Sequence, residues 1–266
     1  MKIAVCVKQV PDSWAEKKMA DGLLDRQGVD AVLNDLDEYA VEEALRIVEA
    51  HGGNGEAGPH SITIISMGPE RATDAARKAL SMGADSAIIV TDNALAGSDA
   101  LATSRVLAKI ISGGDFDLVL CGTESTDARM SVIPAMLAQR LCWASLTFAG
   151  STQVLPDAMS ATITRDTEVG IETITAKLPA VISVIEKINE PRYPSFKGIM
   201  AAKKKVMEIR DLATVGIDAQ SVGGAGAWSS VVDAVSRPAR AAGIKIVDEG
   251  SAGSALVDFL AERKLI

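Results

Sequence analysis

The residues best suited to chemistry form a short polar run after an apolar stretch, Cys121-Gly122-Thr123-Glu124-Ser125-Thr126-Asp127. Gly122 lets a ligand approach the backbone closely. Hydroxyl groups come from Thr123, Ser125, Thr126 and Ser131. Residues 131–141 predict a helix directly afterwards, and the free N–H groups of a helix start can bind a phosphate. The run resembles an adenine-nucleotide site, although it has neither GxGxxG nor GK[ST]; an ordinary well-capped strand-to-helix turn is the alternative.

The remaining polar residues do not form a recognisable catalytic set. His51 and His60 fall in a glycine-rich stretch that predicts a solvated loop. Glu42 and Glu43 occupy the polar face of an expected helix, where paired carboxylates are usually solvated. The sequence suggests no Ser–His–Asp set, Cys–His pair or metal-ligand spacing. Ligand-binding features without bond-breaking groups favour a carrier or binding subunit over a hydrolase.

A second unusual segment, INEPRYPSFKGIMAAKKK, occupies residues 188–205. Pro191 and Pro194 fix φ and disfavour a regular helix or strand, so we expect a stiff, exposed excursion from the sheet. Phe196 lies near its tip among cations, and this arrangement is typical of an interface anchor whose charged neighbours steer the encounter. In the alternative interpretation Phe196 folds back onto the body and the lysines at 203–205 are merely a solvated face.

Short apolar runs that alternate with amphipathic segments predict the scaffold for these residues. Expected strands lie at residues 3–7, 61–66, 86–90, 117–121 and 180–185, with a hairpin at 160–165 and 170–176. Expected helices lie at residues 38–50, 69–82, 99–111, 131–141 and 254–264. This alternation predicts an α/β fold, with an open, mostly parallel sheet flanked by helices in a three-layer, Rossmann-type arrangement. Ligands of such sheets bind at the carboxyl ends of the strands, where loops 7–12, 66–69 and 121–127 meet.

Bulk properties exclude several classes of protein. The net charge of −8 argues against a nucleic-acid binder, and no apolar run reaches the ~18 residues of a membrane span. Three cysteines without metal-ligand spacing indicate buried, reduced thiols and a cytoplasmic protein. Residues 1–206 are expected to form the α/β domain. Residues 207–266, with a Gly/Ser-rich stretch at 221–230, predict a C-terminal arm that cannot form its own core.

Several motifs resemble the β subunit of the electron transfer flavoproteins. They are NEPRYPSFKGIMAAKKK (189–205), LPAVISV (178–184), RDTEVGIE (165–172), VKQVPD (7–12) and ALSMGAD (79–85). The resemblance implies an adenine-nucleotide-hydrolase-like fold and a heterodimer with an α subunit, on which the C-terminal arm docks. It implies FAD held mainly by the α subunit and one structural AMP in the β chain. Electrons would come from acyl-CoA or other flavoprotein dehydrogenases, as in fatty acid oxidation, and pass to a membrane-linked quinone oxidoreductase.

The resemblance also assigns site residues. Its AMP-binding positions map to Cys6, Asn34, Asp35, Leu36, Asp37, Met67, Gly122, Thr123, Glu124, Ser125, Thr126, Asp127, Ala128, Arg129, Met130, Ser131, Val132 and Ile133. Ser13 and Leu36 align near the flavin side. The family's recognition loop maps to residues 189–201, which we call the docking segment, with Phe196 as anchor. Its partner-docking positions are Pro191, Arg192, Tyr193, Phe196, Lys197, Ile199 and Met200, with Asp166 at a position linked to partner release.

Some positions depart from the family pattern. Asp127-Ala128-Arg129 replaces a loop that is richer in glycine and threonine in many relatives, and Arg129 can either supply phosphate charge or crowd the site. The run also lacks the D-G-D-T-like pattern of members with a second FAD, so AMP is favoured. Phe196 replaces the usual leucine, which suggests a wider partner pocket. Asp166 replaces the usual glutamate; from the residues alone, it forms a surface ion pair with Arg165.

The competing hypothesis is a stand-alone, adenine-nucleotide-binding regulatory protein of the same fold. Such a protein would act without a flavoprotein partner and would tolerate loss of residues 207–266. An ATP-using hydrolase or ligase would need a phosphate-loop motif, which the sequence lacks.

Overall fold

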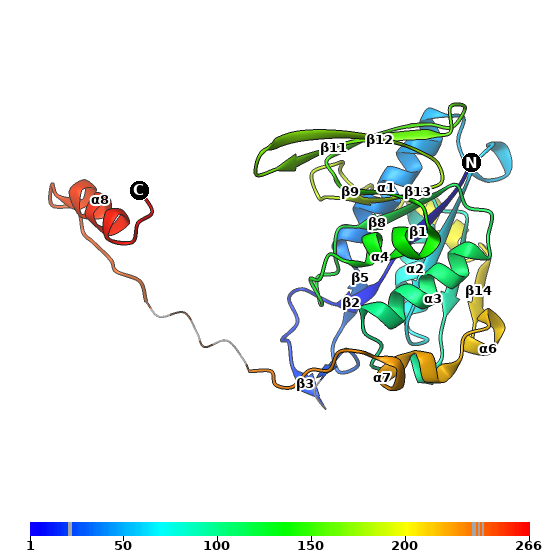
Figure 1. Ribbon diagram of the computed structural model, residues 1–266, viewed down its shortest axis with the longest axis horizontal. Helices are drawn as coiled ribbons and strands as arrows, with labels where there is room; N and C mark the ends of the chain where they lie inside the picture. The colour runs from blue at the N-terminus through cyan, green and yellow to red at the C-terminus, as the bar shows by residue number, and fades with distance from the viewer. Residues whose placement is uncertain (21–22, 236–237, 239, 241) are drawn as a thin grey trace. The chain divides into compact units, whose positions relative to one another are not determined.

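The computed structural model describes all residues except 21–22, 236–237, 239 and 241, the last four of which belong to the expected arm. Its core is a seven-stranded sheet in the order β14-β7-β6-β1-β8-β13-β9 (Figure 1). The strands are β1 (Lys2–Cys6), β6 (Ser61–Met67), β7 (Ser86–Val90), β8 (Leu118–Gly122), β9 (Ala144–Ala149), β13 (Ala180–Val184) and β14 (Met207–Arg210). Every neighbouring pair is parallel, so the predicted α/β class with a mostly parallel sheet is confirmed.

Helices cover both faces of this sheet, which explains why its central strands are mostly apolar on both faces. In β1, Ile3 and Val5 pack in one core cluster, and Ala4 and Cys6 pack in the other. The first cluster includes α1 (Asp35–Ala50) and α2 (Ala72–Met82). The second includes α3 (Ala100–Ser112) and α4 (Ile133–Leu141). The sheet and its two helical layers form the expected three-layer arrangement.

The order of the strands creates a switch point beside β1. The chain passes from β1 to β6 and β7 on one side, and then crosses back to β8 on the other side. Cys6 and Cys121 lie opposite each other at the carboxyl ends of β1 and β8. In open parallel sheets ligands bind outside the strand ends at such a point. The fold therefore brings the three candidate loops to one edge.

A second sheet is antiparallel and consists of β10 (Ser151–Leu155), β11 (Ser160–Thr167) and β12 (Gly170–Lys177). The pairing of β11 with β12 confirms the predicted hairpin. Two small ladders join β2 (Gln9–Pro11) to β5 (Ala31–Leu33) and β3 (Met19–Ala20) to β4 (Leu23–Leu24). Short 3-10 turns occupy Gly55–Ala57, Asn93–Leu95 and Ala219–Ser221.

Two expectations about local structure were wrong. The helix expected from residue 69 begins at Ala72, although it ends as predicted at Gly83, whose φ of 147° suits glycine. The segment 188–205 was expected to contain no regular structure, yet α5 spans Phe196–Ala202. Both prolines precede this helix and do not interrupt it. Ser195 caps the helix by accepting a hydrogen bond from the Gly198 N–H at 3.0 Å.

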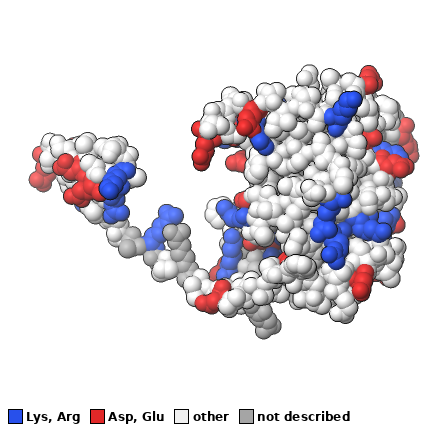
Figure 2. All heavy atoms as spheres, viewed as in Figure 1, with Lys and Arg blue, Asp and Glu red and all other residues white. Residues whose placement is uncertain are grey.

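The chain divides into a body, Met1–Val232, and a second unit, Asp233–Ile266. The body extends past the expected boundary at residue 206, because β14 pairs with β7 and α6 (Leu212–Val215) is buried against the core. A short helix, α7 (Gly223–Gly226), follows, and the second unit contains α8 (Ala252–Glu262). On the visible face, basic and acidic side chains are interspersed among uncharged ones (Figure 2). No helix in the described part of the chain is long and apolar enough to cross a membrane.

Candidate functional site

The candidate nucleotide loop begins where β8 meets the start of α1. A Cβ on Gly122 would lie 2.6 Å from an oxygen of Asp37 and 2.7 Å from the carbonyl carbon of Leu36. Only glycine permits this close approach, as expected for Gly122. The approach brings the stretch 34–37 against the loop 122–133, so both predicted parts of the site meet at the switch point.

Asn34 joins these two parts through its side chain. It is fully buried; its Nδ2 donates to the Glu124 carbonyl at 2.9 Å and its Oδ1 accepts from the Thr126 N–H at 3.0 Å. Both amide ends are therefore used to fix the loop backbone. Asn34 is a positioning residue for the loop.

Asp37 lies buried beneath the loop and accepts a hydrogen bond from the Lys8 N–H at 2.8 Å. Burial raises the pKa of the Asp37 carboxyl to about 7, despite opposing hydrogen bonds from the Asn34 side chain and the Lys8 and Gly122 backbones. The site thus contains a carboxyl group that changes charge near neutral pH.

Asp127 is the residue of the loop that forms ion pairs with two cations. Its carboxylate accepts from Lys8 Nζ and from Arg26 Nε, each at 2.8 Å. Its pKa is lowered to about 2, because these cations and a Ser125 hydrogen bond outweigh partial burial. The sequence predictions missed Lys8 and Arg26 as site residues. The position of Lys8 two residues after the end of β1, within the motif at 7–12, was a signal for Lys8; the sequence offered no signal for Arg26.

The end of the loop leads into α4 without a side-chain cap. Val132 is the N-cap and forms no capping hydrogen bond, so the well-capped turn, which was the alternative to a nucleotide site, is not observed among the described residues. Ser131 donates instead to the Glu124 carboxylate at 2.7 Å. Arg129 and Ser131 both have positive φ, 49° and 54°. The first turn of α4 therefore has the N–H groups of Ile133 and Ala135 without a side-chain acceptor from a cap, since Pro134 carries no N–H, and these groups can donate to an anion.

The other predicted residues lie around this loop with different exposure. Ala128, Arg129, Met130 and Asp35 are exposed; Leu36, Thr123, Val132 and Ile133 are partly buried. Cys6 and Cys121 are buried free thiols, whereas Cys142 is free but exposed, against the expectation of burial. A hydrogen bond with Cys6, together with burial, raises the pKa of the Cys121 thiol. Met67 ends β6, one strand further along the same edge.

The docking segment exposes its aromatic side chains. Tyr193 is 96% exposed and Phe196 is 81% exposed, so Phe196 does not fold back onto the body. Lys197, Ile199 and Met200 are also exposed, while Pro191 and Arg192 are partly buried. The exposed residues come directly after Arg192, whose position is fixed because it binds Glu42 and Glu49 of α1.

The sequence interpretation of Glu42 and Glu43 as solvated carboxylates was wrong. Glu42 and Glu43 are buried and hydrogen-bonded rather than solvated, because Arg192, Asn189 and Thr152 reach them from distant parts of the chain.

The histidines are structural rather than solvated. His51 Nε2 lies 2.9 Å from the Val154 carbonyl, and His60 bridges the N-terminal amine and the His51 carbonyl. Arg165 pairs with Glu172 across the hairpin at 2.7 Å rather than with Asp166, which is exposed. Within the described ranges, no group of three or more His, Cys, Asp or Glu residues is arranged to hold a metal ion.

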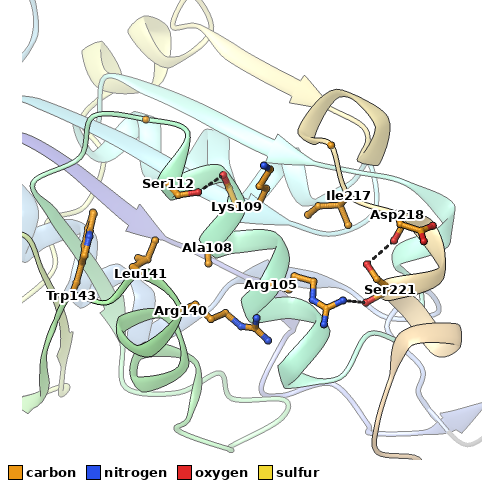
Figure 3. A pocket seen from close by; sticks show the side chains of 12 residues that line it. Arg105, Ala108, Lys109, Ser112, Arg140, Leu141, Trp143, Ile217, Asp218 and Ser221 are labelled. Carbon is orange, nitrogen blue, oxygen red and sulfur yellow. Dashed lines mark hydrogen bonds between the residues drawn. The ribbon is translucent and has the colours of Figure 1, made fainter.

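A cavity of about 710 Å³ lies elsewhere, between α3, α4 and residues 216–221 (Figure 3). Its charged lining residues are Arg105, Lys109, Arg140 and Asp218. Arg105 donates to the Ser221 carbonyl at 3.2 Å and Arg140 donates to the Ser104 hydroxyl at 2.9 Å. Both guanidinium groups therefore hold the cavity wall together, and the lining includes none of the predicted site residues.

Fold and site together define a three-layer α/β protein with a polar, internally hydrogen-bonded loop at the switch point of a parallel sheet. The family described as "Electron transfer flavoprotein domain" matches residues 21–215. "Electron transfer flavoprotein subunit beta" of Mycobacterium leprae (strain TN) is 47% identical over 267 residues, 99% of each chain. The protein of the same name from Megasphaera elsdenii is 34% identical over 99% of this chain and 97% of its own. "Protein FixA" of Azotobacter vinelandii is 34% identical over 90% of this chain and 84% of its own.

The chain therefore belongs to the electron transfer flavoprotein family, as its motifs predicted. Membership confirms the predicted electron-transfer role at the level of the family.

Proposed function

We propose that this chain is the β-type subunit of a heterodimeric electron transfer flavoprotein. An α subunit would hold most of the FAD, and the second unit of this chain, with α8, would dock on it. The observation that carries the proposal is similarity over 99% of both chains to relatives named subunit beta. Electrons would arrive from acyl-CoA or other flavoprotein dehydrogenases and leave to a quinone-linked oxidoreductase. Flavin would supply the redox chemistry, and this chain would bind, orient and dock.

We further propose that the loop 122–133 holds a structural AMP. The residues present fit a mononucleotide phosphate: the N–H groups of Ile133 and Ala135 in the first turn of α4 have no side-chain cap, and the two cations Lys8 and Arg26 share the single carboxylate of Asp127, which leaves net positive charge beside the loop. Asn34 would keep the loop in shape before the nucleotide binds. We place the protein in the cytoplasm, where the buried thiols Cys6 and Cys121 would stay reduced.

The docking segment would present Phe196 to the dehydrogenase. Phe196 is highly exposed at the start of α5, and Arg192, just before this helix, is bonded to α1. Both observations support an anchor side chain that enters a pocket of the partner. Lys197 beside it is exposed as well and would steer the encounter. Asp166, exposed near the end of β11, would take part in partner release.

Co-expression with an α subunit tests the assembly and the ligand together. We expect a yellow heterodimer with a flavin absorbance spectrum, and we expect AMP in the supernatant after denaturation. A second FAD in place of AMP would overturn the ligand assignment. A colourless homo-oligomer that binds ATP or AMP would instead support the stand-alone regulatory protein.

A further inference from the structure

We propose that Arg192 is a positioning residue that clamps the docking segment to α1, and that it does not contact the electron donor itself. This inference rests on the proposed docking function. It revises the sequence prediction, which placed Arg192 among the partner-contacting residues.

The guanidinium group of Arg192 donates hydrogen bonds to two carboxylates of α1. Nε and Nη2 donate to Glu42 at 2.8 and 2.9 Å, and Nη1 and Nη2 donate to Glu49 at 2.6 and 3.0 Å. The Arg192 backbone N–H adds a bond to Glu42 at 3.1 Å. Two bidentate pairs fix both the position and the plane of a guanidinium group. Little of this charge remains for another protein.

The Arg192–Glu42 pair is buried enough to contribute to stability. The Glu42 side chain is 7% exposed, whereas the Glu49 side chain is 50% exposed. Removing one partner of a buried pair leaves an uncompensated charge and is strongly destabilising, while an exposed pair contributes little. Glu42 is therefore the main anchor point, and Glu49 orients the outer edge of the guanidinium group.

Asn189 provides the second side-chain contact that holds the docking segment on α1. Its Nδ2 donates to the Tyr39 carbonyl at 3.1 Å and to the Glu43 carboxylate at 2.9 Å. Glu43 is itself buried and accepts from the Thr152 hydroxyl. Tyr39, Glu42, Glu43 and Glu49 all belong to α1. One helix thus holds the docking segment through two successive side-chain contacts.

The clamp immediately precedes the exposed aromatic residues. Tyr193 directly follows Arg192, and Ser195 then caps α5, which begins with Phe196. A binding segment that is already fixed loses less conformational freedom when a partner binds. The clamp would therefore act on affinity for the donor rather than on the electron-transfer step within the complex.

Steady-state reduction of the complete flavoprotein by an acyl-CoA dehydrogenase tests this role. For Arg192→Gln we expect the KM for the flavoprotein to rise about fivefold or more, with kcat within about twofold and an unchanged salt dependence. Arg192→Lys should not rescue KM, because an ammonium cannot bridge both carboxylates bidentately. The control Lys204→Gln removes the same charge from an exposed residue. A rescue by lysine, or a flatter salt dependence in Arg192→Gln, would show that Arg192 contacts the donor as a charge and would overturn the clamp.

Hydrogen exchange of the same flavoproteins tests the clamp without any donor. Arg192→Gln should speed exchange of the amides in 195–202 at least about tenfold, and the milder Glu49→Gln should do so to a smaller degree. Glu49→Gln keeps the buried pair and should fold normally even if Arg192→Gln does not. Unchanged exchange in Glu49→Gln and in any folded Arg192→Gln would overturn the clamp. Faster exchange with unchanged KM would support the clamp and overturn the docking function instead.

Discussion

At the scale of single residues, the site depends on buried polar groups whose partners are distant in sequence. Asn34 reaches Glu124 and Thr126, and Lys8 reaches Asp127. Residue types and spacing predicted which stretches carry the site, because strand ends and glycines mark them. They could not predict these pairings, and Glu42 was therefore misread as solvated although Arg192, 150 positions away, binds it.

Asp37 gives a pH-dependent prediction. The folded-state pKa is raised from 3.8 to about 7, so the folded protein keeps a proton that the unfolded chain releases above pH ~4. Stability from this group is fully present below the unfolded pKa and is lost as pH rises through about 7. The shift corresponds to at most about 4 kcal/mol.

We therefore expect the Tm of the wild-type protein to fall between pH 5 and pH 8, and the Asp37→Asn variant to lose less over the same range. Thermal melts at four pH values measure the difference. Asp115→Asn, which removes an exposed carboxylate, should keep the wild-type slope. An Asp37→Asn slope equal to that of wild type would show that Asp37 does not hold the proton.

At the scale of elements, hydrophobic periodicity predicted five of the seven strands of the main sheet, the hairpin β11–β12 and the five longest helices, but it missed β9, β10 and β14 among the described strands. It failed where tertiary contacts decide. The four residues of β14 read MEIR, too short and too charged to indicate a strand, and they are ordered by pairing with β7 at the sheet edge. The prolines at 191 and 194 suggested an irregular segment, but they only delay the start of α5.

The element boundary at Val232 can be tested by truncation. A chain ending at Val232 should keep a cooperative melt, because the body is complete. A chain ending at Val206 should aggregate, because it loses β14 and the buried side chains Leu212, Val215 and Val222. Each such side chain contributes about 1.5–3 kcal/mol. Size-exclusion chromatography and thermal melts of the two chains distinguish these results. Equal behaviour of both would contradict the boundary.

At the scale of the whole molecule, the sequence motifs predicted the family and the alternation of elements predicted the fold. The assembly could not be derived from one chain, because the flavin and the α subunit belong to the proposed complex. The central claim is that this chain does no bond chemistry itself and carries a fixed docking segment for an electron donor. Phe196, the proposed anchor of that segment, is 81% exposed and therefore accessible to a partner.

The most direct test is the rate of flavin reduction by an acyl-CoA dehydrogenase in the complete flavoprotein, measured by stopped flow for wild type and Phe196→Ala. Loss of an interface anchor typically costs about 2 kcal/mol or more, so we predict a loss of at least about thirtyfold in kcat/KM. Flavin content should stay unchanged, and the control Leu155→Ala, an exposed aliphatic residue of β10, should react like wild type. Equal reduction rates for Phe196→Ala and wild type would contradict the account.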